Sequence, residues 1–219
     1  MAMRRCLAVL AATGVAACVP MTSSGERAAS FATPEIAAAY LPLEAERYLV
    51  LQGHGAAVVI RPGIAVTNAH NAPLVAPDTV IGVSSAYDLM FFRVTGGKPL
   101  ATAKPSLGER VTAYGQGSDG SLRVAEGTVR WLDAPVEARC PTCPVQHPFA
   151  FEGDAGAGFS GGPVLDAASG ALLGIVFGYN DEEGSSRLIY AYDMARVNAE
   201  LDRLQASQPR QPVAGRDPG

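Results

Sequence analysis

Basic residues are not in excess in this sequence, and charged residues of either sign are few. The formal net charge is -4, and only 17% of the residues are charged. No basic stripe runs along the chain, so nucleic acid is not an expected partner. Hydrophobic residues make up 48%, which supplies a sizeable core and excludes global disorder.

Long apolar runs are absent apart from one at the N-terminus. Residues 1–5 carry two arginines, and residues 6–17 form an apolar run of small residues. The run is too short to span a bilayer as a permanent helix, so residues 1–18 are predicted to be a signal peptide.

The end of this run, Val15-Ala16-Ala17-Cys18, resembles the bacterial lipobox. The resemblance implies that Cys18 is lipidated on its thiol and becomes the mature N-terminus. Val19, in place of an aspartate, favours the outer membrane. The expected location is therefore the periplasmic side of the bacterial cell envelope, with a membrane anchor at the N-terminus. An ordinary signal peptide cut near Ala17 is the alternative.

The rest of the chain shows no internal repeat and is predicted to form one domain over residues 34–204. Residues 19–33 are small and polar and are expected to be a tether. Thr33-Pro34-Glu35 predicts the start of a short helix that Pro42 ends. The tail, residues 205–219, is rich in Pro, Gln and Gly and is expected to be disordered.

Short apolar runs broken by glycine follow from residue 47, with turns such as Arg61-Pro62-Gly63. This spacing indicates antiparallel β structure in barrels or sandwiches. Residues 193–204 instead have apolar side chains at helical spacing, which predicts one short C-terminal helix.

Histidine is scarce, with three in the chain, and nucleophilic serine chemistry needs one as its base. Ser160 lies in Gly158-Phe159-Ser160-Gly161-Gly162, where flexible backbone allows the amides of Gly158 and Ser160 to point at one oxyanion. The string also matches the nucleophile elbow of α/β-hydrolases. That fold requires a histidine after the serine, and none follows Ser160. The remaining order of catalytic residues along the chain is histidine, then aspartate, then serine.

Three segments resemble the trypsin/chymotrypsin-like serine proteases, in particular secreted bacterial, HtrA-like protease domains without a PDZ extension. Residues 53–70, GHGAAVVIRPGIAVTNAH, resemble the hairpin that leads to the histidine. Residues 87–94, YDLMFFRV, resemble the aspartate and its following strand. Residues 158–178, GFSGGPVLDAASGALLGIVFG, resemble the serine segment and the next hairpin.

The resemblance implies an all-β fold of two antiparallel β-barrels (chymotrypsin-like), about residues 46–102 and 103–192, with the site between them. It implies a serine endopeptidase that cleaves cell-envelope proteins through an acyl-enzyme, with His70, Asp88 and Ser160 as its triad. The amides of Gly158 and Ser160 would form the oxyanion hole. The implied substrate-binding strand carries Phe177, Gly178 and Tyr179. Neither a metal nor an organic cofactor is expected.

Two features depart from the family pattern. Asp88 follows His70 by only 18 residues, a short spacing for this class. Phe159 stands where zymogen-activated members carry an aspartate that pairs with a newly freed N-terminus, so that activation step is excluded. A protease-fold lipoprotein acting as a binding module, or inactive at rest, is therefore the alternative function. Asp78 competes with Asp88 for the acid but lies in a turn sequence.

Asp154, six residues before Ser160, stands where trypsin-like enzymes hold the acid that binds a substrate Lys or Arg. A solvated loop aspartate is the alternative at this position. Tyr179 could crowd the mouth of the pocket. His54, between two glycines, is expected at a hairpin tip, and His147 lies in a Pro-rich loop.

Cys140 and Cys143 are predicted to form a small disulfide loop in an oxidising periplasm. A thioredoxin-like redox pair would need a βα context that is absent. Zinc would need a second pair of ligands, of which His147 supplies at most one.

Overall fold

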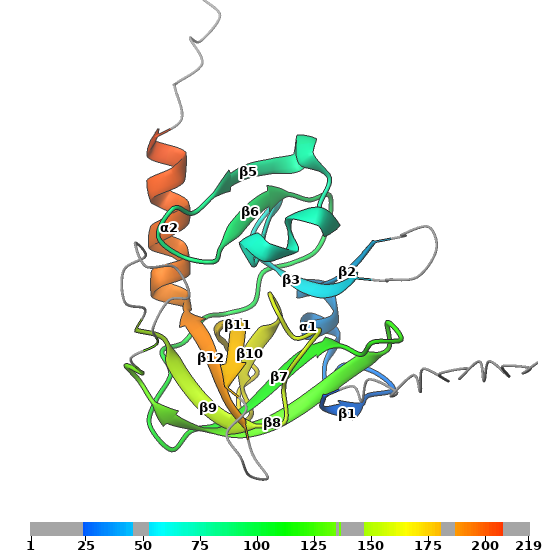
Figure 1. Cartoon of the computed structure of the whole chain (residues 1–219), viewed down its shortest axis with the longest axis vertical. Helices are drawn as coiled ribbons and strands as arrows, with labels where there is room; N and C mark the ends of the chain where they lie inside the picture. The colour runs from blue at the N-terminus through cyan, green and yellow to red at the C-terminus, as the bar shows by residue number, and fades with distance from the viewer. Residues whose placement is uncertain (1–23, 46–52, 135, 137–146, 181–186, 208–219) are drawn as a thin grey trace, which may run out of the picture.

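The computed structural model describes residues 24–45, 53–134, 136, 147–180 and 187–207. Most of the regular structure in these residues is antiparallel β (Figure 1). The elements in chain order are β1 (Glu26–Arg27), α1 (Pro34–Ala39), β2 (Tyr40–Ala45), β3 (Gly53–Arg61), β4 (Ile64–Thr67), the 3-10 helices η1 (Ala69–Leu74) and η2 (Pro77–Thr79), β5 (Val80–Val83), β6 (Met90–Arg93), β7 (Arg110–Gln116), β8 (Leu122–Trp131), β9 (Phe149–Gly153), β10 (Pro163–Asp166), β11 (Leu172–Asn180), β12 (Arg187–Asp193) and α2 (Met194–Ser207).

The N-terminal half is a five-stranded sheet in the order β2-β3-β4-β6-β5. The predicted turn at Arg61-Pro62-Gly63 joins β3 to β4, and Val58 lies opposite Val66 in that hairpin. Alternate side chains of the sheet enclose a small apolar cluster that includes Leu43, Met90 and Phe92. This half carries the histidine and the aspartate of the predicted triad.

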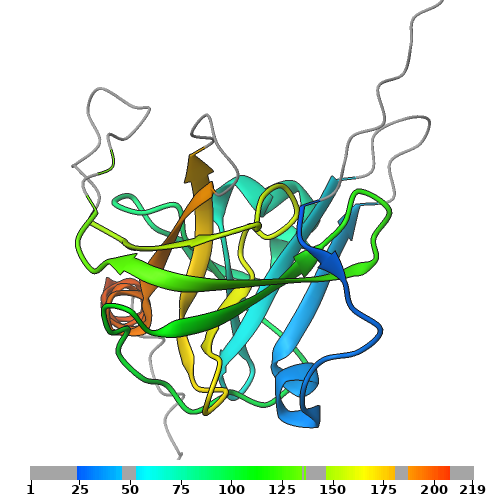
Figure 2. The ribbon, with the colours of Figure 1, turned by 90° about the horizontal axis from the view of Figure 1, so that it is seen from below.

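The C-terminal half is a closed barrel of six strands in the order β8-β7-β10-β11-β12-β9. The long strand β8 closes it by pairing with β9, and β1 adds to the other end of β8 (Figure 2). Its core includes the fully buried side chains of Phe149, Phe151 and Phe159. The residue before the predicted nucleophile is thus anchored in this core.

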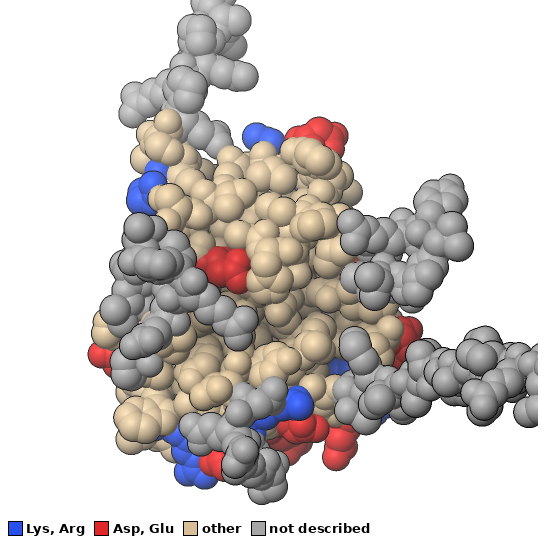
Figure 3. Space-filling view, in the orientation of Figure 1, with Lys and Arg blue, Asp and Glu red and all other residues tan. Residues whose placement is uncertain are grey.

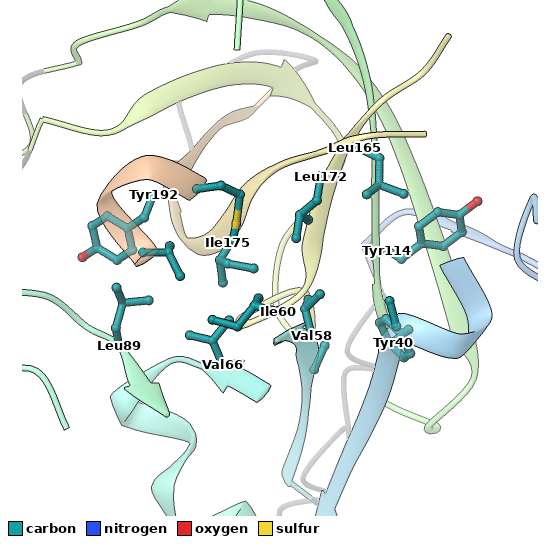
Figure 4. Close-up of a cluster of buried hydrophobic side chains, with 14 of the residues drawn as sticks. Tyr40, Val58, Ile60, Val66, Leu89, Tyr114, Leu165, Leu172, Ile175 and Tyr192 are labelled. Carbon is teal, nitrogen blue, oxygen red and sulfur yellow. The ribbon is translucent and has the colours of Figure 1, made fainter. Parts of the chain in front are cut away.

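A third apolar cluster lies between the halves and draws on both (Figure 4). Val58 and Val66 come from the N-terminal sheet, whereas Ile175 and Tyr192 come from the barrel. Burying a large apolar side chain stabilises a fold by about 1.5–3 kcal/mol. The shared cluster therefore fixes the two halves relative to each other. Helix α2 contacts β5 as well as β11 and β12, which adds a second connection (Figure 1).

The predicted all-β class with two antiparallel halves and a C-terminal helix is confirmed. The described strands close one barrel and leave the other half as a sheet. Thr33 caps α1 by accepting a hydrogen bond from the Ile36 amide at 3.3 Å. The helix ends at Ala39 rather than at Pro42, which lies within β2 opposite Ala56.

The expected tether over residues 19–33 is wrong for its described part. Residues 26 and 27 form β1, and Phe31 packs between the rings of Tyr40 and Tyr114, with centroids 5.0 and 5.1 Å away. A polar composition does not prevent docking when the backbone can add to a sheet edge. Residues 1–18, Cys140, Cys143 and the tail from residue 208 lie outside the described residues.

None of the helices in the described ranges is long and apolar enough to cross a membrane. Most described atoms on the face in Figure 3 are uncharged, and its basic side chains lie towards the edge.

Candidate active site

His70 and Asp88 meet at one end of the N-terminal sheet. β4 ends at Thr67, η1 carries His70, and Asp88 lies just before β6, the strand that pairs with β4. His70 Nδ1 is 2.6 Å from Asp88 Oδ2, and the His70 backbone amide donates to Asp88 Oδ1 at 3.0 Å. Both carboxylate oxygens therefore hold the histidine. Its side chain is 48% exposed, which leaves the ring accessible to solvent.

Two hydrogen bonds to the backbone of Asp88 hold this residue in turn. Its carbonyl accepts a hydrogen bond from the buried Asn68 side chain at 2.9 Å. Its amide donates to the Tyr192 hydroxyl at 3.2 Å. The short loop after His70 is thus tied to both halves of the molecule, which accounts for how an 18-residue spacing can still bring the pair together.

Tyr192 is a functional residue that the sequence analysis missed. Its ring stacks on Phe177 with centroids 4.1 Å apart, and it meets Tyr87 edge-on at 5.4 Å. Burial raises the pKa of the Tyr192 phenol, and hydrogen bonding from the Asp88 amide opposes this only in part. The side chain joins the expected substrate strand to the residue that orients the histidine.

Ser160 lies in the loop between β9 and β10, against the N-terminal sheet. Its carbonyl accepts hydrogen bonds from the Ala56 amide and from Asn71 Nδ2, both at 3.0 Å. Asn71 is buried and also donates to Thr67 Oγ1 at 2.9 Å. The nucleophile's backbone is therefore fixed by the half that carries His70. Asn71 and Thr67 follow the sequence motif around the histidine, but their role appears only in the folded chain.

The two amides of the predicted oxyanion hole lie in the loop between β9 and β10. Within the described residues, the amides of Gly158 and Ser160 donate no hydrogen bond, whereas the Phe159 amide between them donates to Gly156 at 3.0 Å. Gly158 has φ +88°, and a Cβ there would collide with the Gln116 carbonyl. Only glycine fits this position, so the loop leaves two amides available to a developing negative charge.

The expected substrate strand is β11, which has an open edge beyond the site. β10 pairs with β11 only up to Ile175, whereas β12 follows it from Gly174 to Asn180. Among the described strands, residues 178–180 thus have a partner on one side. A Cβ at Gly178 would meet nothing within 4 Å. An extended peptide could add at this edge by main-chain hydrogen bonds.

Asp154 does not lie at the base of a buried pocket. Its side chain is 75% exposed, and Oδ2 accepts a hydrogen bond from the Gly25 amide at 3.3 Å. Its Oδ1 is 3.8 Å from Arg187 Nη1, and Arg187 also lies over the ring of Tyr179 at 5.3 Å. The carboxylate holds the N-terminal part of the chain instead, so the structure does not support a preference for basic substrates based on Asp154.

The other candidates lie elsewhere. Asp78 is in η2, as its turn sequence indicated. His54 is inside β3 opposite Glu44 rather than at a hairpin tip, because the strand begins at Gly53. His147 forms its own pair with Asp133, at 2.8 Å. Within the described ranges, no group of three or more His, Cys, Asp or Glu side chains could hold a metal ion.

Two β halves with His70, Asp88 and Ser160 at their junction define a chymotrypsin-like protease fold. Residues 50–175 match the family model described as the trypsin-like peptidase domain. The chain belongs to this family. No curated protein matches it.

Solved proteases share the fold. The chain is similar to the active form of the Rv3671c protease from M. tuberculosis (TM-score 0.63, 22% identity, covering 81% of this chain and 87% of that chain). An inactive serine-to-alanine mutant of Rv3671c from M. tuberculosis H37Rv also gives a TM-score of 0.63 (23% identity, 81% and 93% covered). The protease domain of MamO from Magnetospirillum magneticum gives 0.58 (16% identity, 76% and 97% covered). The HtrA-type protease AlgW gives 0.58 (20% identity, 78% and 60% covered). At these identities the likeness shows the fold alone.

Proposed function

We propose that the chain is a serine endopeptidase with His70, Asp88 and Ser160 as its catalytic triad. The observation that carries the proposal is the contact of His70 with both oxygens of Asp88, at 2.6 and 3.0 Å. A carboxylate on Nδ1 sets the histidine tautomer so that Nε2 can accept a proton. The family of the chain supports the same chemistry.

The proposed reaction begins when the Ser160 hydroxyl attacks the scissile carbonyl and transfers its proton to His70 Nε2. The amides of Gly158 and Ser160 stabilise the oxyanion of the tetrahedral intermediate. His70 then protonates the leaving amine, and an acyl-enzyme remains on Ser160. Water activated by His70 hydrolyses this ester and restores the serine. No step needs a metal or an organic cofactor.

The substrate would bind in extended form beside residues 177–180. The ring of Phe177 stacks on the ring of Tyr192, whereas Tyr179 is exposed near the end of β11. AlgW, which has the same fold, was solved with a tripeptide. We therefore propose that Phe177, Gly178 and Tyr179 bind peptide segments of protein substrates.

The second candidate function is a protease-fold module that binds a partner or is inactive at rest. One observation favours it: no hydrogen bond joins the ring of His70 to the Ser160 hydroxyl in the described residues. Such bonds are often long before substrate binds, so the observation is compatible with both functions. Enzymatic assay separates them.

Hydrolysis of unfolded protein and of a peptide library tests the proposal. Wild type should cleave, and Ser160→Ala and His70→Ala should each lower kcat by on the order of 10³-fold or more while melting at the same temperature. Folded wild type without cleavage of any substrate would refute the enzyme and favour the binding module.

We also propose that the protein works in the bacterial cell envelope, attached to the outer membrane through lipid on Cys18. This rests on the lipobox resemblance of residues 15–18. Cys18→Ser should move the protein from the membrane fraction to the soluble fraction of cells. Unchanged fractionation would contradict the anchor.

A further inference from the structure

The N-terminal segment, defined as residues 24–28, crosses the loop that carries the nucleophile. Gly25 donates its amide to Asp154 at 3.3 Å, and Ser24 accepts a hydrogen bond from Arg187 at 2.5 Å. Ser24 is buried beside Gly156, where a Cβ would collide with its hydroxyl. The segment thus contacts the loop at two positions before Ser160.

The segment also packs on Phe159, the residue next to Ser160. A Cβ on Gly25 would lie 2.7 Å from Phe159 Cζ and 2.8 Å from the Val124 carbonyl. The backbone of Gly25 therefore packs directly on the buried ring of Phe159. The φ of Gly25 is +69°, a conformation that glycine adopts without strain.

The segment is held in place from its other side by contacts independent of the loop. Glu26 and Arg27 pair with Val124 and Arg123 of β8, and the Ala28 amide donates to Leu122 at 3.0 Å (Figure 2). Arg27 also forms an ion pair with Asp119 in the turn before β8. The barrel wall thus supports the segment, and the segment covers the ring.

We propose that the N-terminal segment is a positioning element for the oxyanion hole, with Gly25 as its central residue. The proposal rests on the proposed function. The two amides of the hole belong to Gly158 and Ser160, on either side of Phe159. Their direction is set by the peptide units that the Phe159 ring anchors. With Gly25 against it, the ring stays in the barrel core and both amides remain directed at one point, without an ion pair between residue 159 and a newly freed N-terminus.

Two glycine variants of the full chain separate this role from simple backbone strain. Gly25→Ala introduces a methyl group against the ring. Gly170 has nearly the same φ as Gly25, +72°, but a Cβ added there would have no atom within 4 Å, so Gly170→Ala introduces the strain without the collision. We expect Gly25→Ala to lower kcat at least tenfold with KM within threefold. We expect amide exchange over residues 156–162 to be at least tenfold faster. Gly170→Ala should stay within twofold of wild type in both.

Removing the ring atoms that collide should rescue part of the defect. Leucine at 159 lacks the outer ring atoms that the new methyl group would meet, whereas the Val124 carbonyl still lies 2.8 Å from it. Gly25→Ala combined with Phe159→Leu should therefore lose less kcat than the product of the two single losses. A double variant whose loss is the product of the two single losses would show that residues 25 and 159 act independently and would overturn the proposal.

Asp154→Ala supplies a second, milder variant, because the Asp154 side chain is exposed. It removes the acceptor of the Gly25 amide and should lower kcat threefold or more for all peptides, with faster exchange over 156–162. Asp202→Ala, which removes another exposed carboxylate, the partner of Arg61, should change neither. A change confined to KM for peptides with Arg before the scissile bond would make Asp154 a specificity residue and overturn this role.

Exchange is measured without substrate, so it decides the inference even if the chain hydrolyses nothing. In that case the proposed function fails, and faster exchange in Gly25→Ala than in Gly170→Ala still shows that the segment holds the loop. Equal exchange and equal kcat in the two glycine variants would overturn the inference while leaving the proposed enzyme intact.

Discussion

Asn71 donates its side-chain amide to the carbonyl of Ser160 at 3.0 Å, which fastens Ser160 to the half of the molecule that carries His70. The two residues are far apart in the sequence and come from different halves. The distance between His70 and Ser160 therefore depends on this hydrogen bond and on the second one, from the Ala56 amide.

Asn71→Ala should damage the site more than the fold. It leaves the part-buried Ser160 carbonyl with one donor, and the loss of a hydrogen bond costs about 0.5–1.5 kcal/mol of unfolding free energy. A misplaced nucleophile should lower kcat by a further factor of roughly ten. Urea unfolding and peptide hydrolysis measure the two effects.

Asn198→Ala is the matched control, because its amide donates to the Met194 carbonyl at 2.9 Å on helix α2. It should lower stability without changing kcat. Equal kcat losses in the two variants would show that the Asn71 bond is merely structural.

Asp88→Asn should abolish most activity while the fold survives. The amide cannot hold the same histidine tautomer, so kcat should fall by on the order of 10⁴-fold. Asp133→Asn alters the similar pair with His147, 2.8 Å apart, and should leave kcat within twofold. Activity retained in Asp88→Asn would exclude Asp88 as the orienting acid and return Asp78 to consideration.

Two buried tyrosines should respond oppositely to loss of their hydroxyl groups. Tyr192 accepts a hydrogen bond from the Asp88 amide, so Tyr192→Phe should cost about 0.5–1.5 kcal/mol and lower kcat. The Tyr40 hydroxyl is buried and has no hydrogen-bond partner among the described residues, so Tyr40→Phe should be neutral or stabilising. Thermal melts of both variants check this; destabilisation by Tyr40→Phe would contradict it.

Both tyrosines should also make the fold sensitive to alkali. Burial raises the pKa of Tyr192 and of Tyr40 above the usual value of about 10. The unfolded chain then releases these protons first, so stability falls as pH rises above about 10 and is unaffected below it. The double variant with phenylalanine at both positions should lose less stability between about pH 9 and 11 than wild type. Urea unfolding at each pH measures this loss. An equal fall of the unfolding free energy with pH in the double variant and in wild type would contradict the assignment.

The class of fold and the contact between His70 and Asp88 could be predicted from local sequence because each depends on short motifs. Glycine-bounded apolar runs indicated the strands, and the order of His70, Asp88 and Ser160 excluded a lipase. Asp154 was misjudged because its position relative to Ser160 does not reveal its partners, Gly25 and Arg187.

The role of the N-terminal segment could not be predicted for a related reason. Residues 24–28 are small or polar, as in a linker, and their binding site on β8 forms only when the barrel closes. Tyr192 and Asn71 likewise act through partners from the opposite half. Such contacts depend on tertiary structure, which no short sequence pattern records.

Ser160 is proposed to act as a nucleophile activated by His70. Reaction of the folded protein with a fluorophosphonate, followed by mass spectrometry of its peptides, tests it most directly. A single adduct on Ser160 is predicted in wild type, absent in Ser160→Ala and at least 100-fold slower to form in His70→Ala. No adduct on folded wild type, or an adduct that persists in Ser160→Ala, would contradict the claim.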